Sequence, residues 1–250
     1  MIESNREIKK PSEKREIMPR FEASALRGYC VSVLTASGVE RSCAEAVADA
    51  LIDAELTGVS THGVSRLAVY MQRMDAGVMS RENNIRIVRE STSTLVVDAG
   101  NSLGAAAAKF AMERCIAKAK ETGCCFASVH SSNHFGTAAY YTRLAAAQDM
   151  IGFACTNLKG KIAPFGSAEP YMGTNPISVA APSDDLPVVL DMAPSVVALG
   201  KLILAQKLEK DFKKLQPVYD FFRKVQTLSF EQTQQEDTPL PKASRQQFDW

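Results

Sequence analysis

The sequence has 250 residues, 46% of them hydrophobic and 23% charged, which is typical of a globular protein. Basic and acidic side chains nearly balance at a formal charge of +1, and no basic cluster is present to neutralise phosphates, so nucleic acid is not expected as a partner. The longest apolar runs, such as Gly104–Ala108, are far shorter than the roughly 20 residues of a membrane span, so no membrane partner is expected either.

Residues 1–20 mix charges of both signs and contain no apolar core, which predicts a disordered leader rather than a signal or transit peptide. The six cysteines show no CxxC spacing. This usage favours reduced, buried thiols and a cytoplasmic protein. The adjacent Cys124 and Cys125 are expected in a buried strand.

Helical patterns come first, at residues 21–37, 42–56 and 63–76, each followed within two residues by a glycine that can end the helix. Ser42 and Glu45 have the spacing of a capping box at the start of the second helix. Strand and helix patterns then alternate, with strands predicted at 85–88, 94–97, 124–129, 151–155, 176–181 and 188–191 and helices at 103–121 and 137–148. The alternation predicts an α/β (mixed α+β) fold in which helices cover a sheet.

The composition changes near residues 201–206. All 14 glycines lie at or before Gly200, whereas eight of the ten glutamines follow it. Apolar residues at helical spacing predict two amphipathic helices, 204–215 and 218–228, separated by Pro217. From Glu231 onward the composition predicts disorder.

Two groups of polar residues are candidates for chemistry. His62, Arg66 and Tyr70 are spaced four apart, so on one helix they would share a face suited to binding a small carboxylate; a solvated helix face is the alternative. His130 and His134 lie in a polar loop after a predicted strand, where a histidine can act as a general base. A metal pair is the alternative for these two histidines, although no third ligand is apparent and no metal is expected.

Glycine-rich turns at Pro164–Ser167 and Gly173–Pro176 allow close backbone approach to a ligand, or are ordinary turns. The sequence contains no GxGxxG, Walker or GxSxG motif. This absence argues against a Rossmann domain, a P-loop enzyme and an α/β-hydrolase.

Taken together, six segments in order resemble the type-2 malate/L-lactate dehydrogenase family, which includes ureidoglycolate and sulfolactate dehydrogenases. These segments are Thr61–Leu67 with Tyr70, Val97–Asn101, Ser132–Gly136, Ala163–Gly166, Gly173–Pro176, and Leu190–Ser195 with Gly200-Lys201. The resemblance covers roughly residues 21 to 205. It implies an NAD- or NADP-dependent oxidoreductase acting on a small 2-hydroxy acid, a cofactor domain that is not of Rossmann type, and a homodimer.

The resemblance also implies roles for individual residues. His134 would be the proton acceptor, and the substrate would be held by Thr61, His62, Arg66 and Tyr70. The cofactor would lie along Leu158, Gly173, Thr174, Asn175, Asp191, Met192 and Ala193. Residues 21–80 would then form a helical substrate-side region and residues 81–205 a sheet-containing cofactor and substrate region.

The sequence departs from the family pattern in three places. Thr61 replaces a serine, Pro194 replaces a threonine, and the Gly-rich segments that continue the family sheet are missing after Lys201. The expectation is therefore a C-terminally truncated member, its sheet incomplete, with a divergent tail at residues 206–250. Its alternative function is that of a catalytically inactive interaction protein, and a histidine-based metal hydrolase is a third hypothesis.

Overall fold

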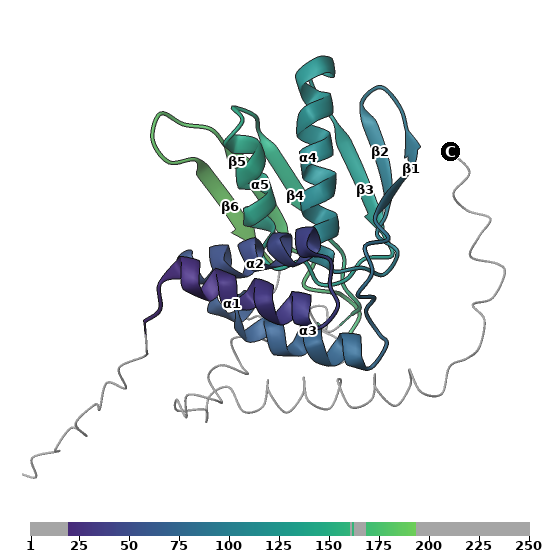
Figure 1. The fold of residues 1–250 in the computed structure, drawn as a ribbon. Coiled ribbons are helices and arrows are strands. Elements are labelled where there is room, and N and C mark those ends of the chain that lie inside the picture. Colours follow the sequence, from purple (N-terminus) through teal and green to yellow (C-terminus); the bar gives the residue numbers. More distant parts are fainter. Residues whose placement is uncertain (1–19, 161, 163–168, 194–250) are drawn as a thin grey trace, which may run out of the picture.

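The computed structural model describes residues 20–160, 162 and 169–193, drawn in colour in Figure 1. Its helices are α1 (Ala23–Ala36), α2 (Arg41–Leu56), the 3-10 helix η1 (Ser60–His62), α3 (Ser65–Asp75), α4 (Gly104–Thr122) and α5 (Ala138–Ala146). Its strands are β1 (Arg86–Glu90), β2 (Thr94–Asp98), β3 (Phe126–His130), β4 (Gly152–Cys155), β5 (Ile177–Ala181) and β6 (Val188–Met192). The mixed α/β class is confirmed. The predictions for residues 1–19, the turn at 164–167, Pro194 and the tail 206–250 lie outside the described residues.

The described strands form two sheets of three strands, where the sequence predicted one sheet. In the first sheet β1 pairs antiparallel with β2, and β2 pairs in parallel with β3 through the α4 crossover. In the second sheet β4, β5 and β6 are all antiparallel. No described strand bonds to both sheets, which is why they remain separate, and they flank α4 in Figure 1.

The main core lies among the helices. Leu34 of α1, Leu51 of α2, Met74 of α3 and Tyr141 of α5 are each at most 1% exposed and belong to one hydrophobic cluster. Alanines dominate the buried face of α2, so the neighbouring helices α1 and α4 can approach it closely. In Figure 1, α1, α2 and α3 form a helical layer below the strands.

The β4–β5–β6 sheet has one covered and one open face. Ser178 and Ala180 are fully buried on the side that packs against α5. On the opposite side Phe153, Leu190 and Met192 are each about half exposed, at 51%, 51% and 52%. Within the described part of the chain, this second face therefore has an apolar surface without a helical cover.

Two local predictions are wrong. The α2 helix begins at Arg41, so Ser42 lies inside its first turn and its hydroxyl donates to Glu40 Oε1 instead of capping the helix. The segment before β3 is not a buried strand, because Cys124 is exposed, Cys125 is half-buried and the strand begins only at Phe126.

The expectation of buried thiols holds for two of the six cysteines. Cys30 and Cys43 are buried in the helical core, whereas Cys155 and Cys124 are exposed. All six are free thiols. None of the described helices combines the length and apolarity that a bilayer crossing demands.

Gly104, the first residue of α4, gives a test of the packing. A Cβ at this position would lie 2.1 Å from the Asn133 carbonyl oxygen and 2.6 Å from that of His134, and both are backbone atoms. Gly104→Ala should therefore lower the free energy of unfolding by about 1–3 kcal/mol, measured by urea denaturation.

Gly28→Ala is the matched control, because a Cβ at this exposed helical position meets no atom within 4 Å. This change should stabilise the protein by about 0.4–1 kcal/mol. Equal effects of the two substitutions would contradict the described contact between Gly104 and the loop.

Candidate active site

The His134 side chain lies in the loop that joins β3 to α5, at the centre of a cluster of rings. The hydroxyl oxygen of Tyr70, on α3, lies 2.7 Å from His134 Nδ1. The rings of His62 and His134 are stacked with their centroids 5.5 Å apart. Residues separated by more than 60 positions thus meet in one small site, as the sequence interpretation required for a shared function.

Burial determines the protonation of this cluster. It lowers the pKa of His134 to about 3, with the nearby charges of His62, Arg66 and Arg73 acting in the same direction. Burial and Arg66 lower the pKa of His62 to about 4, and burial raises the pKa of Tyr70 to about 12. Both histidines are therefore neutral and Tyr70 is protonated at pH 7.

Arg66 lies between His62 and Tyr70 in the sequence, and its charge acts on His62, Tyr70 and His134. Its Nε donates a hydrogen bond to the Thr61 carbonyl oxygen at 2.6 Å, and this bond holds the guanidinium group in place. No carboxylate among the described residues forms an ion pair with Arg66, and its side chain is half-buried. Arg66 therefore has no carboxylate partner among the described residues, so an acid such as a carboxylate would complement its charge.

Thr61 contacts the cluster from the side of η1. Its Oγ1 lies 3.0 Å from His62 Nδ1, so the hydroxyl and the ring orient each other. The predicted substrate-binding residues Thr61, His62, Arg66 and Tyr70 therefore do lie together, next to His134. Whether they contact a substrate stays a prediction.

The prediction that His62, Arg66 and Tyr70 share one helix is wrong. His62 ends η1, and Gly63 adopts an extended conformation before α3 begins at Ser65. Glu55 of α2 causes this break: its carboxylate accepts the Val64 N–H at 2.8 Å and occupies the space where a Cβ of residue 63 would lie. The turn brings His62 over His134, a placement that helical spacing does not reveal.

The predicted cofactor residues gather at one end of the β4–β5–β6 sheet. Asn175 Oδ1 accepts the Leu158 N–H at 2.9 Å, and Gly173 packs so closely that a Cβ would lie 2.3 Å from the Leu158 carbonyl oxygen. Met192 pairs with Ile177, the second residue after Asn175. The predicted cofactor residues thus lie at one end of this sheet, in the last residues of β6 or just beyond the ends of β4, β5 and β6. They are Leu158, Gly173, Thr174, Asn175, Asp191, Met192 and Ala193.

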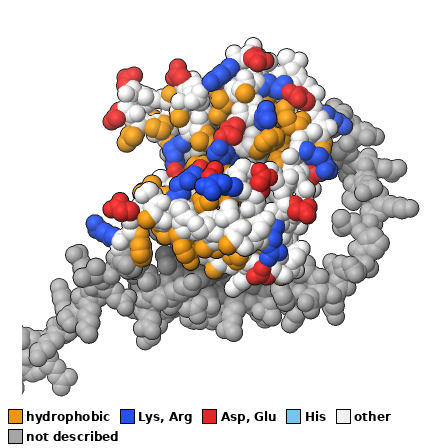
Figure 2. Space-filling model, in the orientation of Figure 1, with side chains coloured by type: hydrophobic (Ala, Val, Ile, Leu, Met, Phe, Trp, Pro, Cys, Tyr) orange, Lys and Arg blue, Asp and Glu red, His pale blue; other side chains and the backbone are white. Residues whose placement is uncertain are grey.

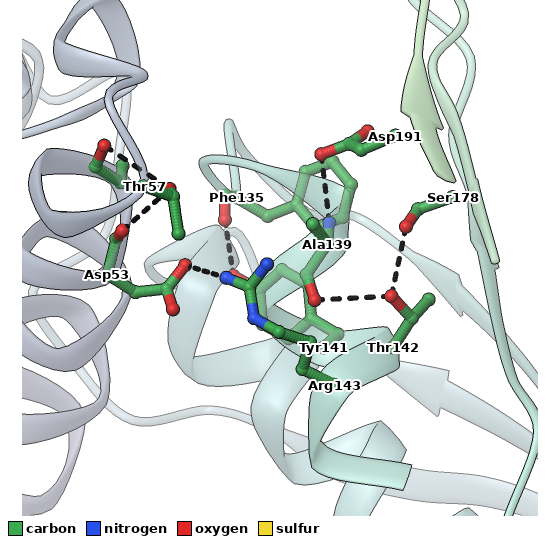
Figure 3. A network of polar contacts seen from close by, with 10 residues as sticks. Asp53, Thr57, Phe135, Ala139, Tyr141, Thr142, Arg143, Ser178 and Asp191 are labelled. Atoms are coloured by element: carbon green, nitrogen blue, oxygen red, sulfur yellow. Dashed lines mark hydrogen bonds and ion pairs between the residues drawn. The ribbon is translucent and has the colours of Figure 1, made fainter. Parts of the chain in front are cut away.

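Asp191 has a structural partner that the sequence interpretation missed. Its Oδ2 accepts the Ala139 N–H at 3.0 Å and so caps the start of α5, where Thr137 makes no side-chain cap (Figure 3). Burial raises the pKa of Asp191. Because α5 follows the His134 loop directly, this contact joins the candidate cofactor edge to the candidate catalytic loop.

Further polar contacts hold α5 in place (Figure 3). Arg143 forms an ion pair with Asp53 of α2, and the Thr142 and Ser178 hydroxyls lie 2.9 Å apart between α5 and β5. The fully buried Tyr141 donates its hydroxyl to the Phe135 carbonyl oxygen, and the two rings stack at 5.2 Å. None of these pairs has a sequence signal, because each joins residues brought together by tertiary packing.

The two histidines of the loop point to different surroundings. The Nδ1 atom of His130 lies 3.8 Å from Asp98 Oδ1 and 3.0 Å from Ser131 Oγ. The His134 ring instead contacts Tyr70 and His62. Among the described residues, no three His, Cys, Asp or Glu side chains come close enough to hold a metal ion. Residues 131–137 are not helical, so the helical spacing considered for a metal pair at residues 130 and 134 is not present.

On the face shown in Figure 2, basic and acidic side chains are interspersed with apolar ones rather than gathered in regions of one sign. This pattern follows from the nearly balanced composition.

Comparison with known proteins identifies the class to which this fold and site belong. Residues 21–215 match the model of the malate/L-lactate dehydrogenase family, and the chain belongs to that family. The malate dehydrogenase of Pyrococcus horikoshii is 41% identical over 77% of this chain and 53% of its own length. Its solved structure superposes with a TM-score of 0.72, covering 74% of this chain and 53% of that one.

Two further relatives carry a cofactor in their names. The ureidoglycolate dehydrogenase (NAD(+)) of Escherichia coli K12 is 33% identical over 69% of this chain and 50% of its own. The (2R)-3-sulfolactate dehydrogenase (NADP(+)) of Chromohalobacter salexigens is 38% identical over 71% of this chain and 53% of its own. The chain spans about half the length of the curated relatives it matches.

The lowered histidine pKa values predict how stability depends on pH. In the unfolded chain, His62 and His134 become protonated near pH 6.5. In the folded protein their pKa values are about 4 and about 3, so they stay neutral to lower pH. The free energy of unfolding therefore decreases as the pH falls below 6.5. Each histidine should contribute up to about 1.4 kcal/mol per pH unit to the slope. Urea denaturation between pH 4.5 and 7.5 measures it.

A glutamine at position 134 removes one of the two titrating groups, so His134→Gln should give a shallower slope than the wild type. His130→Gln, at a side chain 52% exposed and outside the ring cluster, is the matched comparison. If H134Q and the wild type have the same slope, His134 is not buried as a neutral imidazole.

Proposed function

We propose that the protein is an NAD- or NADP-dependent oxidoreductase that interconverts a small 2-hydroxy acid, malate- or lactate-like, and its 2-oxo acid, with His134 as the proton acceptor. The observation that carries this proposal is the contact of Tyr70 and His62 with His134 beside Arg66, which has no ion-pair partner among the described residues. Family membership supports it, because the matched relatives are named as dehydrogenases of malate, sulfolactate and ureidoglycolate. A cytoplasmic homodimer is part of the proposal.

His134 can take the hydroxyl proton only at a nitrogen that carries no hydrogen. In the described geometry both the Tyr70 hydroxyl and the Gly136 N–H face Nδ1, at 2.7 and 3.4 Å. Without substrate this geometry places the hydrogen on Nε2. On substrate binding the Tyr70 hydroxyl would rotate to accept a hydrogen bond from Nδ1–H, which would leave Nε2 as the free base for the substrate hydroxyl. The Tyr70 hydroxyl serves either tautomer because it can both donate and accept.

The substrate carboxylate completes the charge balance of the site. Arg66 would bind it by charge-assisted hydrogen bonds, which add about 1.5–3 kcal/mol. A bound carboxylate also brings a negative charge near His134, and this raises the basicity of a group that burial and neighbouring cations otherwise suppress. The base would therefore become effective only when its substrate is present.

The residues at the edge of the β4–β5–β6 sheet fit a nicotinamide cofactor. Leu158 and Met192 offer half-exposed apolar contacts, at 46% and 52%, and the Thr174 hydroxyl and half-buried Asn175 lie between them in the chain. Gly173 lets this turn pack without a side chain. When bound, the cofactor supplies the acceptor for the hydride that leaves the carbinol carbon.

The second hypothesis is a catalytically inactive member that acts as an interaction protein. The open apolar face of Phe153, Leu190 and Met192 favours it, because such faces mark contacts with other polypeptides. Cofactor binding separates the two hypotheses.

Titration of the purified chain with NADH and NADPH, followed by cofactor fluorescence, should give a saturable signal with at least one of them. With cofactor and a panel of 2-hydroxy acids, His134→Ala should lower kcat by about 10²–10⁴-fold while leaving cofactor affinity unchanged. The absence of any saturable signal would favour the interaction protein, and full turnover in H134A would remove His134 from the mechanism.

Substitution of Arg66 tests the carboxylate site separately. Arg66→Gln should weaken binding of the 2-hydroxy acid by about 10–150-fold, since a charge-assisted contact of about 1.5–3 kcal/mol is lost. Cofactor affinity should not change. The control is Arg41→Gln, an exposed arginine whose only described ion pair is with Glu45 in the same helix; an equal loss in both variants would contradict the assignment.

A further inference from the structure

We propose that Asn133 is a positioning residue for His134, whose side-chain amide fastens the His134 loop to the turn at Asn101. The proposal rests on the proposed function in one respect, the catalytic use of His134. The effect of the Asn133 hydrogen bonds on the His134 ring can be measured without any turnover.

The amide of Asn133 makes an unusually large number of contacts. Its Nδ2 has two hydrogens to share among three acceptors, the Asn101 carbonyl oxygen at 3.0 Å, Asn101 Oδ1 at 2.9 Å and the Ser102 carbonyl oxygen at 3.0 Å. Its Oδ1 accepts a longer bond of 3.4 Å from Arg73 of α3. The Asn133 side chain thus connects the loop after β3 with the turn after β2, beside the backbone bond that the Asn101 N–H donates to the Ser131 carbonyl oxygen at 2.8 Å.

Asn101 extends this connection to the helix that carries the other site residues. Its backbone has a φ of 60°, which lets its carbonyl oxygen and its side chain serve different segments. The side-chain Nδ2 donates to the Val78 carbonyl oxygen at 3.0 Å, and the Ser80 N–H donates to the Asn101 carbonyl oxygen at 2.9 Å. Val78 and Ser80 follow α3, so Asn101 joins the end of the Arg66–Tyr70 helix to the His134 loop.

The residue on each side of His134 is held by a different partner. Asn133 is fixed by its amide, and its carbonyl oxygen packs against Gly104 at the start of α4. The Phe135 carbonyl oxygen accepts the hydroxyl of the buried Tyr141. With both neighbours anchored, the imidazole has little freedom and meets Tyr70 at hydrogen-bond distance.

Loss of the Asn133 amide should release one of these two anchors while the core remains intact. The imidazole would then move away from the two groups that face Nδ1, the Tyr70 hydroxyl and the Gly136 N–H. Its two neutral tautomers would mix, and water would reach the ring. These changes differ from those of a merely structural defect, which would lower stability and leave the state of the His134 ring unchanged.

The test is nuclear magnetic resonance of the histidine rings in the full chain labelled with 15N, where only three histidines contribute signals. In the wild type, His134 should show one tautomer with hydrogen on Nε2. In Asn133→Ala the signals should become those of a tautomer mixture, and the pKa of His134 should rise by about one pH unit or more toward 6.5 as water reaches the ring.

Asn83→Ala is the matched control, since Asn83 is an exposed asparagine whose amide donates only to Glu40 Oε2. It should leave the His134 signals unchanged. If Asn133→Ala does not fold, Asn133→Leu removes the same Nδ2 donor and keeps a side chain of similar size.

Unchanged His134 signals in a folded N133A or N133L variant would overturn the positioning role, whatever the activity. If the wild type turns over a 2-hydroxy acid, N133A should lower kcat about tenfold or more without changing cofactor affinity. If no turnover is found but the ring signals shift as expected, the positioning role stands and the proposed function fails.

Discussion

The hydrogen bond between Tyr70 and His134 is the contact on which the candidate site depends. It joins a helix of the N-terminal layer to the loop after β3, and it places a buried neutral imidazole against a buried phenol. Both groups lose hydration on burial, so each requires the other as a hydrogen-bond partner. The surrounding contacts of Glu55, Asn133 and Tyr141 keep the two elements at the distance this bond needs.

The electrostatics of the site follow from the same burial. Three neighbouring groups act on the charge of His134, and each of them opposes its protonation. They are the guanidinium groups of Arg66 and Arg73 and the imidazole of His62. Arg66 and Arg73 are cations, and no described carboxylate forms an ion pair with Arg66, so an anion would complement the arrangement.

The second sheet gives the protein two distinct surfaces. The face against α5 is sealed by Ser178, Ala180 and the capping carboxylate of Asp191. The opposite face presents Phe153, Leu190 and Met192 to solvent within the described part of the chain. The candidate cofactor residues lie at one end of this sheet. The open face is therefore close to the region where a cofactor would bind.

Local sequence patterns were sufficient for the helices and strands, because hydrophobic periodicity and glycine stops are properties of neighbouring residues. They also gave the candidate residues His62, Arg66, Tyr70 and His134, through motifs that resemble a known family. They did not give the break before α3, the separation into two sheets or the exposure of Cys124. Those features depend on contacts between different elements, such as the hydrogen bond from the Val64 N–H to Glu55. Such contacts form only when the chain folds, so no pattern of neighbouring residues predicts them.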